Sequence, residues 1–171
     1  LYEYLALRVG DEYTDVWSAT FLARGTADLD GKHGDDHRGY YAFDSLNDSY
    51  DSRVNGKLYT GYVTYRANTG VLDKARLGRQ YIDAAQTFHV DGLRVISNPL
   101  DKDLDLRVSV YGGVPVHLYE SSPRGDMIAG LSVELDPWRG THIEADYAYV
   151  EDDLSDFGTE NNDWAALSVW Q

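Results

Sequence analysis

The chain has 171 residues, enough for one domain with a sizeable core. It carries 29 acidic and 15 basic residues, a formal net charge of −14, which argues against a nucleic-acid partner because such a partner needs basic stripes. It contains no cysteine, so disulfides and thiolate metal sites are excluded. No apolar run approaches the roughly 20 residues that a membrane-spanning helix needs.

Segments in which apolar and polar residues alternate predict strands along the whole chain. The opening LYEYLALRVG is the first, followed by DVWSATFLARG and KLYTGYVTYRA. KARLGRQYI and GLRVISN come next and alternate less cleanly. DLDLRVSVYGG, MIAGLSVELDP, THIEADYAYVEDD and DWAALSVWQ complete nine candidate strands of about 8 to 11 residues, the length of a tilted membrane strand. Only YIDAAQTF can be read as helical.

The connections between these candidate strands alternate in length. Long polar loops are predicted at 28–55, 113–126 and 151–163, and short turns are predicted near Gly10–Thr14 and at NPLDK and DPWRG. Outer-membrane barrels have this asymmetry, with short turns at one end and longer loops at the other. A soluble sandwich has no reason to produce it so regularly.

The faces of the strands favour the same interpretation. In THIEADYAYVEDD, the apolar and aromatic residues from Ile143 to Tyr149 share one parity, and His142, Glu144 and Asp146 share the other. Small and aromatic residues suit a lipid face, and charged residues suit a water-filled lumen. We therefore expect an all-β fold: an antiparallel up-and-down transmembrane β-barrel, or a segment of one, forming a single domain over 1–171. The alternative is a soluble β protein with one wet face.

Three stretches carry a resemblance: LYEYLALRV, ARLGRQYIDAAQTFHVDGLRV and LRVSVYGGVPV. They resemble bacterial outer-membrane porin-like barrels, including uncharacterised proteins of deltaproteobacteria and the barrels of porin–cytochrome conduits. In those proteins a strand ending in Gly-Arg-Gln (here Gly78–Gln80) precedes an Asp-Gly-Leu-Arg strand (here Asp91–Arg94). The rhythm of strands is similar over most of the chain, and the motifs cover about 40 residues.

The resemblance implies a location in the outer membrane of a Gram-negative bacterium. Such barrels run to several hundred residues, whereas nine strands, an odd number, do not close a single-chain bacterial barrel neatly. We therefore expect this chain to be the N-terminal part of a larger barrel, or one domain cut from it.

The alternation along each strand assigns candidate residues either to the lumen or to the lipid interface. Arg79 falls on the outward-facing parity although it is charged, and we expect it either to reach an interface or to be turned inward by a bulge. Arg76 and Arg94 join the lumen if their strands keep simple register. The alternative for the lumen set is a group of solvated ion pairs without a role in selection. The predicted pore-lining residues are Arg24, Arg66, Arg107, Glu134, His142, Glu144 and Asp146. The predicted lipid-interface aromatics are Trp17, Tyr59, Tyr65, Trp138, Tyr147 and Tyr149.

Metal binding and catalysis have little support. In DLDGKHGDD, Asp28, Asp30, Asp35 and Asp36 could supply oxygens to Ca²⁺, but the distal glutamate of an EF-hand is absent and an acidic external loop is favoured. The histidines have no metal-ligand spacing, and no nucleophile elbow or phosphate loop occurs. We expect no cofactor and no enzymatic activity.

Three functions are compatible with these observations. The first is a channel for small hydrophilic solutes, with the lipid bilayer as its other partner. The second is a sheath that houses a partner such as a multihaem cytochrome, which would bring its own haem because the chain lacks Cys-x-x-Cys-His. The third is a soluble acidic β-sandwich that binds carbohydrate through tyrosine and tryptophan.

Overall fold

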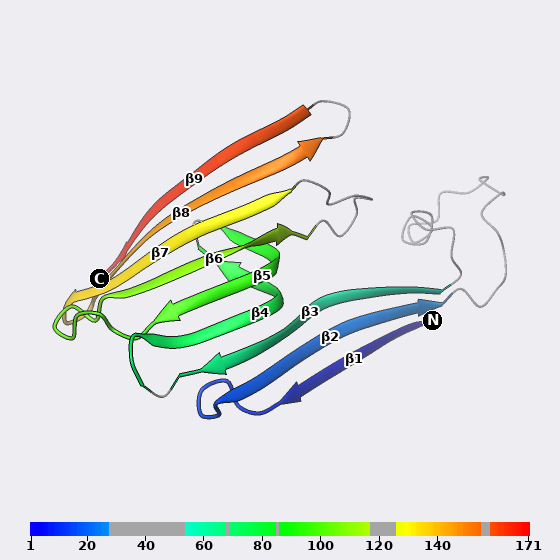
Figure 1. Ribbon diagram of the computed structural model, residues 1–171, viewed down its shortest axis with the longest axis horizontal. Helices are drawn as coiled ribbons and strands as arrows, with labels where there is room; N and C mark the ends of the chain where they lie inside the picture. The colour runs from blue at the N-terminus through cyan, green and yellow to red at the C-terminus, as the bar shows by residue number, and fades with distance from the viewer. Residues whose placement is uncertain (28–53, 68, 85, 117–125, 155–157) are drawn as a thin grey trace.

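The computed structural model describes residues 1–27, 54–67, 69–84, 86–116, 126–154 and 158–171. The all-β prediction is confirmed, because the described residues form nine strands in one antiparallel sheet, in the order of the sequence (Figure 1). The strands are β1 (Tyr2–Val9), β2 (Trp17–Ala27), β3 (Val54–Arg66), β4 (Leu72–Asp83), β5 (Thr87–Ser97), β6 (Arg107–Pro115), β7 (Met127–Trp138), β8 (Thr141–Leu154) and β9 (Gly158–Trp170). The sheet is open, since β1 and β9 do not pair with each other. Within the described ranges, no helix is long and apolar enough to span a bilayer.

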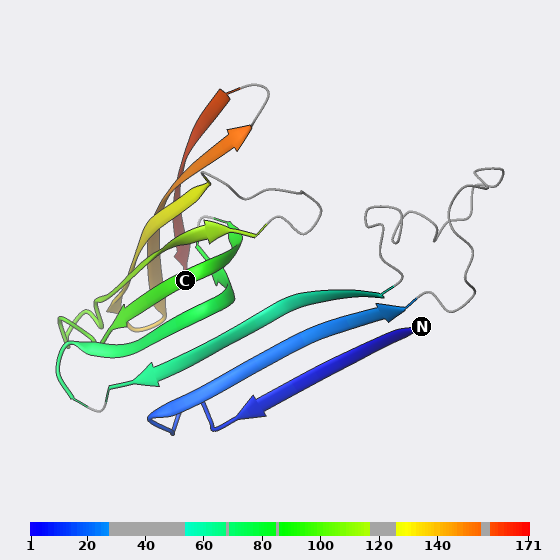
Figure 2. The same cartoon turned by 45° about the vertical axis from the view of Figure 1, so that its right-hand side comes forward.

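The register gives the sheet two chemically different faces. Cross-strand partners share a face, so the chain of partners Arg76–Arg94–Tyr111–Gly130–Ala148 defines what we call the inner face. The neighbouring row, Leu77–Leu93–Gly112–Ala129–Tyr149, lies on the outer face. The sheet curls instead of lying flat, and β4 to β9 enclose the inner face (Figures 1 and 2).

A row of glycines sits where the sheet bends. Gly78, Gly92 and Gly113 are direct partners across β4, β5 and β6, on the inner face. A Cβ atom on Gly92 would lie 2.8 Å from the Cα of Gly113, and one on Gly113 would lie 2.6 Å from the Cα of Gly92. Gly78 adopts a φ of 125°, which side chains disfavour. The absence of side chains therefore allows the backbones to approach inside the curve.

The sheet divides between β3 and β4. These two strands pair only from Gly61 to Arg66 against Lys74 to Arg79, whereas β3 pairs with β2 down to Val54. Beyond Gly61, β3 continues beside β1 and β2 while β4 curves away (Figure 2). The division leaves backbone carbonyls of β3 without a ladder partner from β4.

Two predicted long loops are shorter than expected, and the end of the third lies in a strand. The segment 113–126 begins inside β6, which continues to Pro115, and 151–163 mostly belongs to β8 and β9. The last two residues of 28–55 belong to β3, and the rest lies outside the described residues. The boundaries were wrong because backbone hydrogen bonds extend the β8–β9 ladder through polar pairs such as Glu151 with Asn161. The short turns separate β1 from β2, β3 from β4, β5 from β6 and β7 from β8, and we call this side of the sheet the turn end.

Candidate functional site

The inner face carries a basic band over β3 to β5. Arg66 is the partner of Lys74, and Arg76 is the partner of Arg94. The guanidinium carbon of Arg76 lies 4.4 Å from the ring centre of Tyr62, a cation–π distance. Two arginines in direct opposition repel each other, so this band needs an anion to balance it.

An acidic patch lies on the same face, on β7 and β8. Glu134 of β7 is the partner of Glu144 of β8, and Asp146 follows on the same side of β8. The hydroxyl of Ser132 donates to Glu144 at 3.4 Å. Arg107 of β6 is the partner of Glu134, yet its guanidinium bonds Asp105 at 3.3 to 3.4 Å. The inner face therefore runs from basic to acidic across the sheet.

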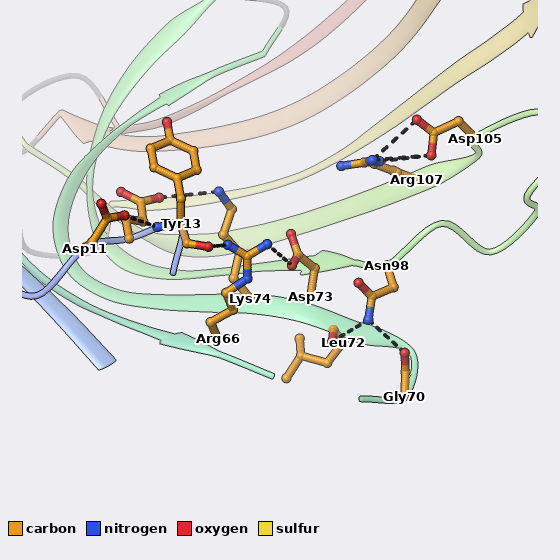
Figure 3. Close-up of polar contacts among 11 residues, drawn as sticks. Asp11, Tyr13, Arg66, Gly70, Leu72, Asp73, Lys74, Asn98, Asp105 and Arg107 are labelled. Carbon is orange, nitrogen blue, oxygen red and sulfur yellow. Dashed lines mark hydrogen bonds and ion pairs between the residues drawn. The ribbon is translucent and has the colours of Figure 1, made fainter. Parts of the chain in front are cut away.

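The turn between β1 and β2 folds across the inner face and contacts the basic band (Figure 3). The Glu12 carboxylate accepts from Arg76 and from Nζ of Lys74, the latter at 3.3 Å. The carbonyl of Tyr13 accepts from Arg66, and Lys74 lies 5.9 Å from the Tyr13 ring centre. Burial alone would raise the pKa of the Glu12 carboxyl, but the charges of Arg76 and Lys74 outweigh burial, and the pKa lies below its ordinary value.

Further polar contacts join the neighbouring turns. The guanidinium of Arg66 pairs with Asp73 at 3.5 Å. The side-chain amide of Asn98 donates to the carbonyls of Gly70 and Leu72 at 2.8 and 2.9 Å, which ties the end of β5 to the β3–β4 turn (Figure 3). The turn end is thus held by side chains as well as by the strand ladder.

An apolar cluster occupies the inner face at the opposite end of β4 and β5. Its members are Ile82, Phe88, Val90, Tyr111, Ile128 and Ala148. Ile82, Val90 and Ile128 have no exposed surface, although a single sheet ordinarily leaves both faces accessible. The curl packs these side chains against one another. The water-filled lumen expected on the inner face therefore does not extend to this end, where apolar side chains are buried against one another.

The outer face is apolar and exposed. Leu7 on β1, Leu77 on β4 and Leu167 on β9 expose 57%, 64% and 71% of their surface. Other exposed apolar side chains of this face come from all the strands between, and include Val63, Leu93, Val110, Leu131 and Tyr147. A surface of this extent marks an interaction site, because soluble monomers rarely expose large contiguous apolar patches.

One polar cluster interrupts the outer face at the division of the sheet. Arg79 pairs with its partner Asp91 and donates to the carbonyl of Leu58 at 2.9 Å. A ring nitrogen of His89 lies 2.7 Å from the carbonyl of Tyr59, and the His89 ring stacks on Tyr81. The side chains of β4 and β5 thus satisfy carbonyls that β4 leaves free on β3. Arg79 stays on the outer face, so the alternative in which a bulge turns it inward was wrong.

Four of the six predicted interface aromatics, Trp17, Tyr65, Tyr147 and Tyr149, keep the outer parity, and Trp138 lies beyond a register shift in β7. Trp17 and Tyr65 are cross-strand partners with ring centres 4.8 Å apart, and Trp138 is exposed beside the β7–β8 turn. Tyr147 and Tyr149 lie on the outer side of β8 and bond Asp163 and Glu151. Tyr59 differs, because it is the extra residue of a bulge in β3 and its ring lies 5.6 Å from the guanidinium carbon of Arg24.

All predicted pore-lining residues lie on the inner face, but they do not form one cluster. Arg24 lies near the far end of β2, between the rings of Tyr2 and Tyr59. His142 is at the turn end, where Nδ1 lies 2.8 Å from Asp136. An open hollow of about 560 Å³ lies there, lined in part by His142, Trp138 and Trp170. Sequence reasoning missed Glu12, since a turn carboxylate gives no periodic signal. It also missed Lys74, although the inner parity of Arg76 pointed to it.

Metal and catalytic chemistry find no new support in the described part of the chain. It contains no group of three or more His, Asp or Glu side chains placed to hold a metal ion. The calcium candidates Asp28, Asp30, Asp35 and Asp36 lie outside the described residues. Comparison with known proteins adds no identity, because no family model, curated protein or solved structure matches the chain.

Proposed function

We propose that this chain forms part of the wall of an outer-membrane channel of a Gram-negative bacterium, with the outer face against lipid and the inner face toward a conducting lumen. The proposal rests on the chemistry of the two faces, which is the reverse of that in a soluble protein. The exposed face is mainly apolar across all strands, although the Arg79–Asp91 pair interrupts it, and the basic band and the acidic patch lie on the inner face. A bilayer favours this arrangement and water opposes it.

The pattern of strands supports the same proposal. An antiparallel meander in sequence order is the topology of outer-membrane barrels, and its short turns lie at one end. A carbohydrate-binding sandwich would cover the apolar face with a second sheet, and the described strands form one sheet. The free edges of β1 and β9 need partner strands in a bilayer, because unpaired backbone groups in hydrocarbon are each unfavourable by several kcal/mol.

The inner surface favours selective passage of charged or dipolar solutes. Basic side chains on β3 to β5 face the same enclosed space as acidic side chains on β7 and β8. Opposed patches create a transverse field that orients a dipole and selects by charge. The apolar cluster at the far end narrows the route near β4 to β6 and directs solutes along the polar part of the wall.

Conductance in planar bilayers tests the proposal. The complete protein that contains this chain should open stepwise, ohmic channels when added from detergent. The matched control is the same protein with Leu77 and Leu93 both replaced by Asp, which disrupts the apolar outer face and should abolish insertion. Absence of conductance in the unaltered protein, with insertion verified by protease protection, would overturn the channel and leave the partner-filled sheath as the better explanation.

A further inference from the structure

Three cations converge at one place on the inner face. Arg76 and Arg94 are direct partners across β4 and β5, and Lys74 projects from the same side of β4 two residues before Arg76. The Nε of Arg94 donates to Ser109 at 3.0 Å, and its terminal nitrogens have no acceptor among the described residues. The Nε of Arg76 is buried and has no partner there either. The cluster therefore retains unused hydrogen-bond donors in an enclosed, electropositive place.

The anion that this cluster holds belongs to the protein itself. Glu12 crosses β2 and β3 from the β1–β2 turn, and its carboxylate meets both Lys74 and Arg76. Glu12 lies in a turn and not in a strand, and the turn is held by local bonds such as that from the Tyr13 N–H to Asp11 at 2.7 Å and by the bond from Arg66 to the Tyr13 carbonyl. Glu12 thus shows which chemistry the cluster recognises: a carboxylate oxygen that accepts from one terminal nitrogen of an arginine and from an ammonium group.

We propose that Lys74, Arg76 and Arg94 form a binding site for small dicarboxylates, and that Glu12 occupies it as a displaceable internal counter-ion. One carboxylate of the solute replaces that of Glu12 on Arg76 and Lys74. The second carboxylate reaches the free nitrogens of Arg94, whose Cα is the cross-strand partner of that of Arg76. The inference deepens the proposed channel by naming a solute class, and it rests on that function only for the route by which the solute arrives.

The competition has a measurable consequence. A tethered carboxylate acts at an effective concentration in the millimolar range, so it weakens the binding of any solute that must displace it. Removing the charge of Glu12 should therefore tighten binding of a dicarboxylate, although the protein loses one of its own contacts. If Glu12 formed only a structural ion pair, removing its charge would weaken dicarboxylate binding or leave it unchanged.

The experiment is calorimetric titration of succinate into the complete protein in detergent, at fixed ionic strength. We expect millimolar binding by the unaltered protein, about tenfold tighter binding by Glu12→Gln, and at least tenfold weaker binding by Arg76→Gln. Asp103→Asn and Arg139→Gln, which make the same charge changes in exposed turns, should bind as the unaltered protein does. Acetate should bind more weakly than succinate, because it lacks the second carboxylate.

The proposal is overturned if Glu12→Gln and Asp103→Asn bind succinate equally, or if Arg76→Gln retains full affinity. Arg94→Gln provides a second test if Arg76→Gln does not fold, and it should weaken succinate binding while leaving acetate binding nearly unchanged. Binding is measured without a membrane, so its failure leaves conductance untouched. Loss of conductance with intact binding would instead overturn the channel alone.

Discussion

Arg79 faces Asp91 across β4 and β5, and its guanidinium donates to both carboxylate oxygens at 2.7 and 2.5 Å. A third bond, from Arg79 to the carbonyl of Leu58, joins the pair to β3 at the point where β3 and β4 separate. The pair is charged, yet it lies on the apolar outer face. Because it bonds all three strands at this point, the pair stabilises the place where the sheet divides.

Removing one partner of this pair should lower the free energy of unfolding more than removing both. Asp91→Leu leaves the Arg79 charge without a counter-ion on an apolar face, and we expect a loss of about 1–3 kcal/mol in unfolding free energy after allowing for partial exposure. The double variant Arg79→Leu/Asp91→Leu should recover most of that loss. Urea unfolding in lipid vesicles measures both, with Arg139→Leu as the exposed control. Equal destabilisation by the single and double variants would show that the pair does not act as a unit.

The glycine row should tolerate no side chain. Gly92→Ala places a Cβ against the backbone of β6, and the strands must move apart, so we expect a loss of about 3 kcal/mol or complete failure to fold. Gly25→Ala is the matched control, because no atom lies within 4 Å of the position of its Cβ. That variant should be neutral or slightly stabilising. Similar stability of the two variants, measured by urea titration, would mean that the curl does not depend on this close approach.

The alternation of apolar and polar residues in the sequence predicted most of the strands. The segment from Thr141 to Val150 alternates cleanly, and its strand and both faces were predicted. The prediction failed where the pairing of the strands, and not the pattern of side chains, determines how far a strand extends or which face a residue occupies. The β8–β9 ladder continues through polar residues, and the bulge at Tyr59 breaks a parity that the sequence preserves.

The site was predicted less fully than the strands. Strand parity found the inner positions of Arg66, Arg76 and Arg94, because each lies within a regular strand. It could not find that Glu12 joins them, because that contact links residues 64 positions apart through the fold of a turn. The apolar cluster also escaped prediction, since Ile82 and Phe88 flank a connection whose curl is set by glycines in other strands.

Ion selectivity should respond to the two inner patches with opposite signs. Arg24→Gln/Arg66→Gln should shift the reversal potential in a salt gradient toward cations, since the acidic patch loses its balance. Glu134→Gln/Glu144→Gln should shift it toward anions by a similar amount. Single-channel recordings of the complete protein provide the measurement. If neither pair moves the reversal potential, these side chains do not border the conducting path, and a lumen filled by a partner becomes the better explanation.

Acid should release the turn that Glu12 holds. The pKa of Glu12 is lowered in the folded protein, so the contact contributes stability that is fully present above the ordinary glutamate pKa near 4.5 and is lost as pH falls through the lower folded value. Below that pH, a fluorophore attached at Asp11 should become more mobile. In Glu12→Gln the mobility should already be high at neutral pH and should not change on acidification. An unchanged acid transition in that variant would assign the release to another group.

An accessibility scan along β8 tests most directly whether the outer face lies against lipid. The chain contains no cysteine, so spin labels can be attached one at a time to cysteines introduced from Ile143 to Tyr147. In vesicles, labels at Ile143, Ala145 and Tyr147 should collide mainly with lipid-soluble oxygen, and labels at Glu144 and Asp146 mainly with a water-soluble nickel chelate. The predicted result is an alternation with a period of two residues. Equal protection of both parities from both reagents would contradict it, because that result describes a strand buried on both faces in a soluble core.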